Sequence, residues 1–521
     1  MIKGYKKASV FLSIVMLLAL LVSACSSNNN SNNNSNQGEP SKGASSPAAT
    51  ETATPEATQE SLEPVTLKWL VPKTATMDKA DEVFAAVNKL TQEKINATID
   101  FMLVDFGEYD QKVSMMLAAN ENFDIAFTSN WLNPYIPNVA KGAYLALDDD
   151  MLKKYAPQTM ATTSAAVWDA IKVDGKIYGT PIQQIYVRQF GLMFKEELLD
   201  KYKFDYTSVA KLEDLEPYLK QIKENEPDLF PLEAVGSSIW ESALGYYGFD
   251  SLIGVKTPGA VKSFGELKAV NQYESQEFKD YVTLMHDWYQ KGYIQKDAAT
   301  STTDYRSQGK YAVATVPALQ PGGDVQFSST QAGGTPYVGY GIGEQPPLTT
   351  GSIQATLNAI NKNSKNPERA LMFIDLLNSD PEILNMMAFG LEGLSYTKNA
   401  DGKVVQKMDG AYDGVYNFFV GNVFNTYYTE GQPDGVWEET AKINEEAKPS
   451  VALGFVFNSE PVTNELAKVQ AVIDQYLKAL ASGSVDVDKV LPEFIQKLKN
   501  AGSDAIVAEL QKQLDAWAAK K

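Results

Sequence analysis

Residues 64–128 alternate between two hydrophobic patterns, and this alternation restricts the fold more than any other feature of the chain. Alternating or continuous apolar runs predict strands at 64–71, 97–104 and 123–128. Apolar residues at helical spacing predict helices at 79–94 and 109–119. Strands that alternate with helices typically form parallel sheets with helices packed on their faces. We therefore predict an α/β lobe with a mostly parallel sheet.

A polar segment with one tryptophan follows the third predicted strand and reads Thr128-Ser129-Asn130-Trp131. Ligands of open α/β sheets bind beyond the carboxyl ends of the strands, where the connecting loops diverge. The Trp131 ring can stack on the apolar face of a sugar, and Asn130 can bond hydroxyl groups. The alternative is a packing role, in which Trp131 only covers the edge of the lobe.

The part of the chain expected to fold, from about residue 61 to 521, is too long for one hydrophobic core and predicts two or more lobes. A turn and a short strand at 173–181 continue into a long β-favouring stretch at 182–194. We interpret this stretch as a crossover between lobes. Residues 465–517 predict successive helices with glycine breaks.

The N-terminus has the layout of a secretory signal, with three lysines followed by an apolar run from Ala8 to Val22. This run is shorter than the roughly 20 residues that a membrane-spanning helix needs. The segment Val22-Ser23-Ala24-Cys25 resembles the lipobox of bacterial lipoproteins, which predicts cleavage before Cys25 and lipidation of its thiol. An ordinary secreted protein with a free thiol is the alternative.

Residues 26–60 are rich in Ser, Asn, Thr, Ala, Pro and Gln and contain no aromatic residue. Such a segment cannot bury enough apolar surface to fold, so we predict a flexible tether between the lipid anchor and the folded part. Cys25 is the only cysteine in the chain, which excludes an intramolecular disulfide.

Charge and composition exclude several classes of function. A formal net charge of −19 disfavours nucleic acid and anionic lipid as partners, because both would be repelled. With His286 as the only histidine, the usual zinc, copper and iron ligand sets are absent. His286 lies in an amphipathic helical pattern, and no G-x-S-x-G motif supplies a nucleophilic serine. We predict no metal and no cofactor.

The order of the segments resembles the extracellular solute-binding proteins of ABC importers, in particular the oligosaccharide-binding group. No single segment is decisive, and the resemblance depends on their order. The segments that carry it are FDIAFT at 123–128, GAYLALD at 142–148, KYAP at 154–157, the turn and strand at 173–181, YRSQGKYAV at 305–313 and AINKNSKNPERALMFIDLLNS at 359–379. The tail from Gly454 to Trp517 resembles the uncharacterised C-terminal domain of a Gram-positive lipoprotein subgroup.

This resemblance implies a two-lobe α/β fold of type II with hinge crossovers and a helical C-terminal region. It implies a monomer that captures a solute without converting it and delivers it to a permease in the membrane. The implied organisation is a signal peptide at 1–24, an anchor and tether at 25–60, a first lobe at 61–184 and 350–430, and a second lobe at 185–349 and 431–521.

Six residues in predicted loops or strand ends are candidates for ligand binding, and a carbohydrate is the ligand class that the resemblance favours. They are Asn130, Trp131, Tyr178, Trp240, Glu241 and Glu392. Trp168 and Trp437 are further aromatic candidates, although aromatic residues more often belong to the core.

Two other functions and one other ligand class stay open. A surface glycoside hydrolase would need two carboxylates about 5 to 10 Å apart across a cleft, and no motif selects such a pair. A signalling lipoprotein with the same fold would report the solute to a membrane sensor. A peptide-like solute would use similar aromatic and polar loops.

Overall fold

The computed structural model describes residues 62–187, 189–407 and 409–520. The predicted signal peptide, Cys25 and the tether lie outside the described residues. In the part of the chain that is described, no helix is long and apolar enough to span a bilayer.

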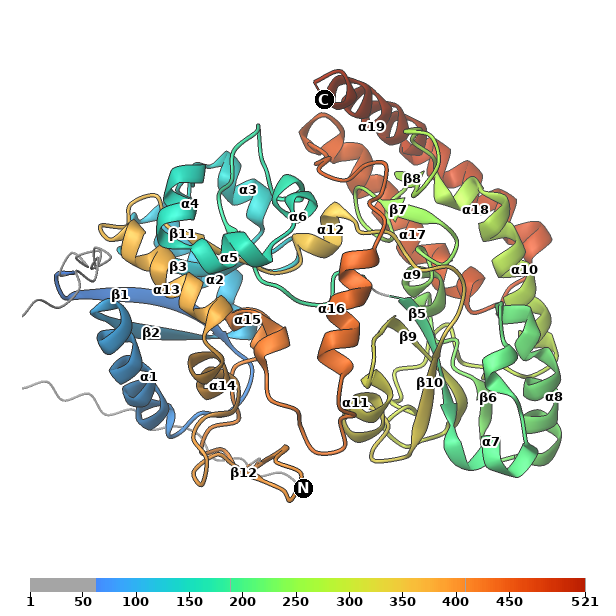
Figure 1. The fold of residues 1–521 in the computed structure, drawn as a ribbon. Helices are drawn as coiled ribbons and strands as arrows, with labels where there is room; N and C mark the ends of the chain where they lie inside the picture. Colours follow the sequence, from blue (N-terminus) through green and yellow to red (C-terminus); the bar gives the residue numbers. More distant parts are fainter. Residues whose placement is uncertain (1–61, 188, 408, 521) are drawn as a thin grey trace, which may run out of the picture. The chain divides into compact units, whose positions relative to one another are not determined.

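The first lobe contains a five-stranded sheet with the strand order β2-β1-β3-β11-β4 (Figure 1). Its strands are β1 (Val65–Lys73), β2 (Ala97–Asp105), β3 (Ile125–Thr128), β4 (Thr180–Pro181) and β11 (Leu357–Ile360). β1 pairs in parallel with both β2 and β3, whereas β11 is antiparallel to β3 and β4. Four strands therefore run in one direction, and the mostly parallel sheet is confirmed.

Helices cover this sheet and bury their apolar stripes against it. The helix α1 (Ala80–Ile95) buries Val83, Phe84 and Val87 and contacts β2. It also packs beside α13 (Pro367–Ser379) and α14 (Pro381–Phe389), each of which has a proline in its first turn. The other helices of this lobe are α2 (Tyr109–Ala118), α3 (Tyr135–Ala140), α4 (Asp149–Tyr155), α5 (Pro157–Thr162), α6 (Ala165–Ala170), α12 (Thr350–Ile353) and α15 (Asn417–Val420).

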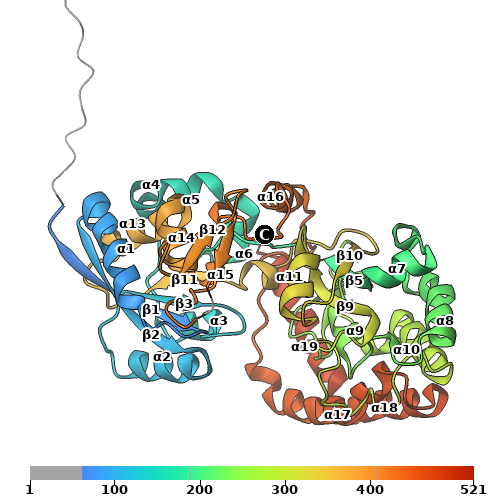
Figure 2. The ribbon, with the colours of Figure 1, turned by 90° about the horizontal axis from the view of Figure 1, so that it is seen from below.

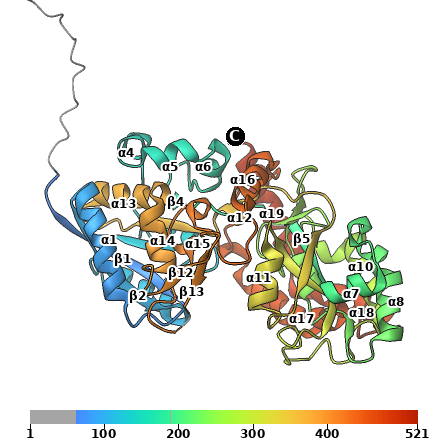
Figure 3. The ribbon, with the colours of Figure 1, turned by 60° about the horizontal axis from the view of Figure 1, so that its bottom comes forward.

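Smaller elements complete the first lobe. Figure 3 shows α4, α5 and α6 as a row of short helices. A two-stranded sheet is formed by β12 (Tyr396–Lys398) and β13 (Val404–Gln406).

The predicted long strand at 182–194 is wrong over its first half. β4 ends at Pro181, and the next strand, β5, covers only Gln189–Lys195. Residues 182–187 do not pair with a neighbouring strand. The backbone N–H of Tyr186 instead donates to Oδ1 of Asn444, 3.0 Å away in α16 (Val436–Glu446). A side chain thus satisfies a backbone donor that a neighbouring strand would otherwise bind.

The second lobe contains a four-stranded sheet with the order β10-β5-β9-β6. Here β9 (Tyr311–Leu319) pairs antiparallel with β5 and parallel with β6 (Phe230–Leu232), and β10 (Tyr337–Gly341) is antiparallel to β5. A separate hairpin is formed by β7 (Phe249–Ser251) and β8 (Ala260–Lys262). The helices α7 (Glu196–Tyr202), α8 (Glu216–Asn225), α9 (Ser238–Ser242), α10 (Gln276–Gln290) and α11 (Gly323–Thr330) belong to this lobe.

Three C-terminal helices pack into the second lobe. They are α17 (Thr463–Ala481), α18 (Val487–Ala501) and α19 (Ser503–Ala518), and Figure 2 shows α17 and α18 on the outer side of that lobe. The Tyr281 hydroxyl of α10 donates to the Ala481 carbonyl at 2.7 Å. Nδ1 of His286 lies 2.8 Å from the carbonyl oxygen of Gly483. The only histidine therefore lies, half-buried, at a contact between helices.

Each lobe has its own large hydrophobic core. The chain passes from one lobe to the other three times. The first core includes Tyr186, Leu348 and Leu453, whereas the second includes Phe190 and Ile342 and resumes at Val462. The second and third connections run side by side. The Leu348 N–H donates to the Lys448 carbonyl, and the Ser450 N–H donates to the Leu348 carbonyl. The predicted lobe boundaries themselves stay a prediction.

Replacing Gly483 by alanine should lower the stability of the second lobe. Gly483 has a φ of +75°, and an added Cβ would lie 2.1 Å from the Met285 carbonyl oxygen. Left-handed strain plus this clash should cost roughly 3 kcal/mol or more in the free energy of unfolding, measured by urea denaturation.

Gly402→Ala is the matched control, because Gly402 has a φ of +78° and open space around it. It carries the left-handed strain without the clash, so its loss of stability should be clearly smaller. Equal losses in the two variants would contradict the close packing of α10 against the C-terminal helices.

Candidate functional site

The carboxyl ends of four strands meet at one edge of the first sheet. Lys73 ends β1 and pairs in register with Asp105, which ends β2. Thr128 ends β3 and Pro181 ends β4, while the antiparallel β11 begins at this edge. We call this side of the sheet the carboxyl edge. It is where open α/β sheets hold their ligands.

Three exposed aromatic rings surround a buried one at the carboxyl edge. Phe106, Trp131 and Tyr416 are 42%, 46% and 54% exposed, whereas Phe419 is 1% exposed. Their ring centroids lie 6.4, 6.2 and 5.9 Å from that of Phe419. We call Phe106, Trp131 and Tyr416 the aromatic platform. A cluster of solvent-exposed rings on a folded lobe marks a surface for binding an amphipathic ligand.

The orientation of Trp131 is set by hydrogen bonds on both sides. Its backbone N–H donates to the Ser129 hydroxyl at 3.1 Å, and its Nε1 donates to the Ala355 carbonyl at 2.8 Å. Nδ2 of the neighbouring Asn130 donates to the Gly351 carbonyl at 2.8 Å. These bonds tie the loop after β3 to the segment before β11. The Trp131 ring is therefore held in place before any ligand arrives.

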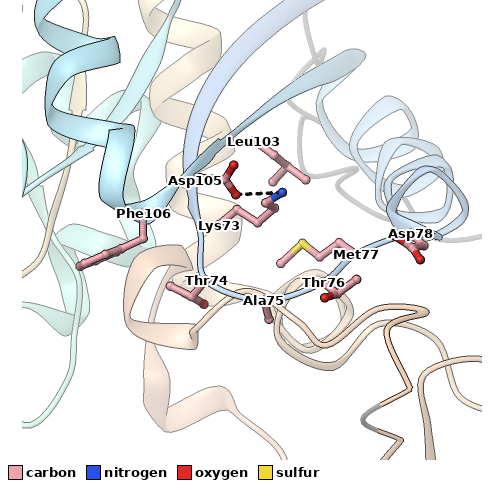
Figure 4. A pocket seen from close by; sticks show the side chains of 9 residues that line it. All are labelled: Lys73, Thr74, Ala75, Thr76, Met77, Asp78, Leu103, Asp105 and Phe106. Atoms are coloured by element: carbon pink, nitrogen blue, oxygen red, sulfur yellow. Dashed lines mark ion pairs between the residues drawn. The ribbon is translucent and has the colours of Figure 1, made fainter. Parts of the chain in front are cut away.

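A cavity of about 550 Å³ adjoins Phe106 at the ends of β1 and β2 (Figure 4). Lys73 Nζ and Asp105 Oδ1 form an ion pair at 2.9 Å on its wall. Oγ1 of Thr74, which also lines the cavity, is buried and has no hydrogen-bond partner among the described residues. Asp78 supplies a further exposed carboxylate. The cavity thus offers several hydrogen-bonding groups next to an aromatic ring.

The structure brings together only two of the six predicted ligand-binding residues, Asn130 and Trp131. Tyr178 is half-buried against the first core, and its N–H donates to the Tyr135 hydroxyl at 3.2 Å. Glu392 lies in an exposed loop with Lys398 Nζ 3.9 Å away. Neither residue lines the cavity or the platform.

Trp240 lies in the second core and not at the platform. Its side chain is 0% exposed in the second core, with ring centroids of Phe278 and Tyr281 at 4.7 and 5.4 Å. A ring that is enclosed in this way has no free face for a sugar. Glu241 is also engaged, because it accepts a hydrogen bond from Ser237 and pairs with Lys256 at 3.3 Å.

The two further tryptophan candidates, Trp168 and Trp437, also lie outside the platform. Trp168 is 7% exposed in the first core. Trp437 is half-buried near Phe424.

Sequence reasoning missed Phe106, Tyr416 and the Lys73–Asp105 pair. Phe106 begins the short 3-10 helix Phe106–Glu108 directly after β2, and Thr74 directly follows β1. The rule that selected Trp131, a position just beyond a strand, would also have selected these two. Tyr416 lies far away in the sequence, and no local pattern connects it to the platform.

The arrangement is suited to binding a ligand. Rings stack on apolar ligand faces, and the cavity groups bond hydroxyls. Among the described residues, no group of three or more His, Cys, Asp or Glu side chains is placed to hold a metal ion. The site therefore has the composition of a binding surface for a polar ring with apolar faces.

Comparison with known proteins identifies the family. Residues 85–411 match the model of the bacterial extracellular solute-binding proteins, and residues 451–519 match a domain of unknown function. The chain is 33% identical over 465 residues to a carbohydrate ABC transporter substrate-binding protein of Streptococcus pneumoniae, covering 85% of this chain and 89% of that protein.

Solved structures agree with this match. An N-glycan transport solute binding protein (NgtS) of Streptococcus pneumoniae has a TM-score of 0.77 and 32% identity, over 88% of this chain and 100% of that one. The same protein was also solved in complex with Man1GlcNAc, with a TM-score of 0.66 and 31% identity over 87% of this chain and 99% of that one. An HMO binding, ABC-transporter associated solute binding protein of Bifidobacterium longum infantis has a TM-score of 0.63 and 17% identity, over 87% of this chain and 99% of that one, and shares the fold.

The predicted two-lobe α/β fold of type II, with its helical C-terminal region, is confirmed by the two sheets and by these structures. The matched region spans most of the first lobe and a large part of the second. The chain belongs to the bacterial extracellular solute-binding proteins.

Proposed function

We propose that this protein is an extracellular receptor that binds an oligosaccharide and delivers it to the permease of an ABC importer. The aromatic platform carries the proposal. Phe106, Trp131 and Tyr416 expose roughly half of their surface at the edge of the sheet where ligands of this fold bind. A sugar ring offers C–H faces for stacking and hydroxyls for hydrogen bonding, which the platform and the adjoining cavity match.

An oligosaccharide fits the extent of the site better than a single sugar. Phe106 borders both the platform and the cavity of about 550 Å³, so one ligand can occupy both. The cavity is lined by one ammonium group, Lys73, and two carboxylates, Asp78 and Asp105, which does not favour an anionic ligand. The relative that was solved with Man1GlcNAc supports the same ligand class.

Capture without conversion is also part of the proposal, and the substrate-binding proteins that the chain resembles support it. We propose that ligand binding shifts the two lobes of a monomer toward a closed state, which the permease recognises. A role of Tyr178, Glu241 and Glu392 in binding stays a prediction. A glycoside hydrolase would instead release products from the bound sugar, which makes the two functions separable by experiment.

Lipid anchoring at Cys25 is a further part of the proposal and depends on the sequence of the N-terminus. A single acyl chain binds membranes only marginally, so durable attachment needs the several chains of a bacterial lipoprotein. An anchored receptor stays near its permease, which raises the rate of delivery.

Replacing Cys25 by serine should release the protein from the membrane, because serine lacks the thiol that would be acylated. Membrane and soluble fractions of expressing cells, compared by immunoblot, measure this change. Ser26→Ala is the control and should stay in the membrane fraction. If the Cys25→Ser protein remains membrane-bound, the anchor is not at this cysteine.

An oligosaccharide should raise the melting temperature of residues 26–521. A ligand at 100 times its Kd stabilises the native state by about 2.7 kcal/mol. Thermal unfolding against neutral mono- and oligosaccharides, followed by product analysis, tests the proposal. A shift with unchanged sugar supports a receptor, whereas a shift with cleavage products supports a hydrolase. If only peptides raise the melting temperature, the ligand is a peptide and the carbohydrate assignment is wrong.

Replacing Trp131 by alanine should weaken binding of that sugar by about 30-fold, near 2 kcal/mol, because the stacking surface is lost. Trp131→Phe should keep most of the affinity. Isothermal titration calorimetry measures the affinity and thermal unfolding the stability of each variant.

Two controls separate binding from folding. Phe264→Ala removes another exposed ring, 50% exposed and far along the sequence, and should leave affinity unchanged. Trp240→Ala should instead lower stability by about 3 to 5 kcal/mol, because it empties part of the second core. A Trp131→Ala protein with full affinity would exclude the platform as the site.

A further inference from the structure

A second cavity, of about 450 Å³, lies at the edge of the first sheet opposite to the aromatic platform. Asn361 follows β11 directly, and the last residue of β11 pairs with Ile125, the first residue of β3. Trp131 lies beyond the other end of β3. We call this cavity the amino-edge cavity. Asn361 and Trp131 therefore lie beyond opposite ends of β3.

The amino-edge cavity carries positive charge on a strongly acidic protein. Lys141 and Lys362 line it, and no Asp or Glu does. Nζ of Lys362 lies 3.7 Å from the position that a Cβ on Gly142 would occupy, which places the ammonium group over the cavity wall. Neither lysine forms an ion pair with any residue that the structure describes. The whole chain has a net charge of −19, so the positive charge of this cavity is opposite in sign to that of the chain.

A buried carboxamide adds a hydrogen-bond donor to the two ammonium groups. Asn361 is 3% exposed and lines the cavity. Its Oδ1 accepts the backbone N–H of Asn363 at 2.9 Å, and an N–H can only donate, so the orientation of the amide is determined. Its Nδ2 has no partner among the described residues. This donor is left for a ligand.

A second buried carboxamide presents an acceptor. Nδ2 of Asn133 donates to the Phe127 carbonyl at 2.7 Å, so Oδ1 of Asn133 accepts from Nδ2 of Asn138. Oδ1 of Asn138 is consequently the free end of a side chain that is 4% exposed. The cavity thus combines cationic donors, one amide donor and one acceptor. An acceptor of this kind suits a hydroxyl group.

The carboxylate of Asp124, the residue before β3, does not neutralise this site. Asp124 accepts the Asn361 N–H through its backbone carbonyl at 2.9 Å, but its carboxylate is turned to other partners. One oxygen accepts the Lys68 N–H at 2.8 Å, and the other accepts the Ser364 hydroxyl at 2.5 Å. Asp124 does not line the cavity.

We propose that the amino-edge cavity binds a small oxyanion, a phosphate or carboxylate group with a hydroxyl beside it. Lys141, Lys362 and Nδ2 of Asn361 bind the anionic oxygens, and Oδ1 of Asn138 accepts from the hydroxyl. The site is separate from the sugar-binding role, so either proposal can fail without the other.

Titration of residues 26–521 with inorganic phosphate, glycerol phosphate, acetate and lactate at constant ionic strength tests this site. Thermal unfolding and calorimetry give the affinities, and chloride at equal ionic strength is the baseline. We expect saturable binding for one of the two anion types, strongest for its hydroxylated member. Comparison of the phosphate and carboxylate titrations identifies which anionic group the cavity binds. Binding no stronger than that of chloride in every arm would overturn the proposal.

Two variants and one control locate the binding. Lys141→Gln combined with Lys362→Gln should lower the affinity for the anion by about tenfold or more. Asn361→Asp keeps the acceptor for the Asn363 N–H and replaces the donor by a negative charge. It should lower the affinity for the anion at least as much as the double lysine variant does. Lys89→Gln combined with Lys468→Gln changes the net charge equally at exposed helix positions and should have little effect. Equal losses in both lysine pairs would overturn the site. Sugar affinity should be unchanged in all of them.

Discussion

The parallel pairing of β1 with β2 and β3 is the constraint on which the candidate site depends. It places Lys73, Asp105 and Thr128 at one edge, although they are spread over more than fifty residues of sequence. The buried Tyr109 hydroxyl reinforces this pairing, because it lies 3.0 Å from the Leu70 carbonyl of β1 and 3.2 Å from the Phe127 carbonyl of β3. The loops that carry Phe106, Trp131 and the segment Thr74–Asp78 of the cavity all begin from these strands.

The C-terminal helices contribute to the core of the second lobe and do not depend on the strand pairing of the first sheet. Phe494, Leu498 and Ile506 lie in the same core as the helix α10. The segment that leads into these helices also bonds the β7–β8 hairpin of the second lobe, because the Ser450 hydroxyl donates to Asp250 of β7 at 2.5 Å. Burial raises the pKa of Asp250 to about 6. The domain of unknown function at 451–519 is thus built into the second lobe.

Trp131 and Trp240 show how far local sequence reasoning reaches. Both were predicted in loops or at strand ends with polar neighbours. Trp131 follows a strand that the hydrophobic pattern located within two residues, so its position at the carboxyl edge could be predicted. Trp240 lies in the short helix α9, and its burial depends on Phe278 and Tyr281, which come forty residues later. Burial against distant residues leaves no trace in a local pattern.

The sequence by itself determined the alternation of strands and helices, the two-lobe size and the residues just beyond the first strands, because hydrophobic periodicity is a local property of the chain. Tertiary structure alone decided that Tyr416 joins Phe106 and Trp131 around Phe419, and that Asn138 and Asn361 meet two lysines. These groups come from segments separated by up to about 310 residues, and only the packing of the first lobe brings them together.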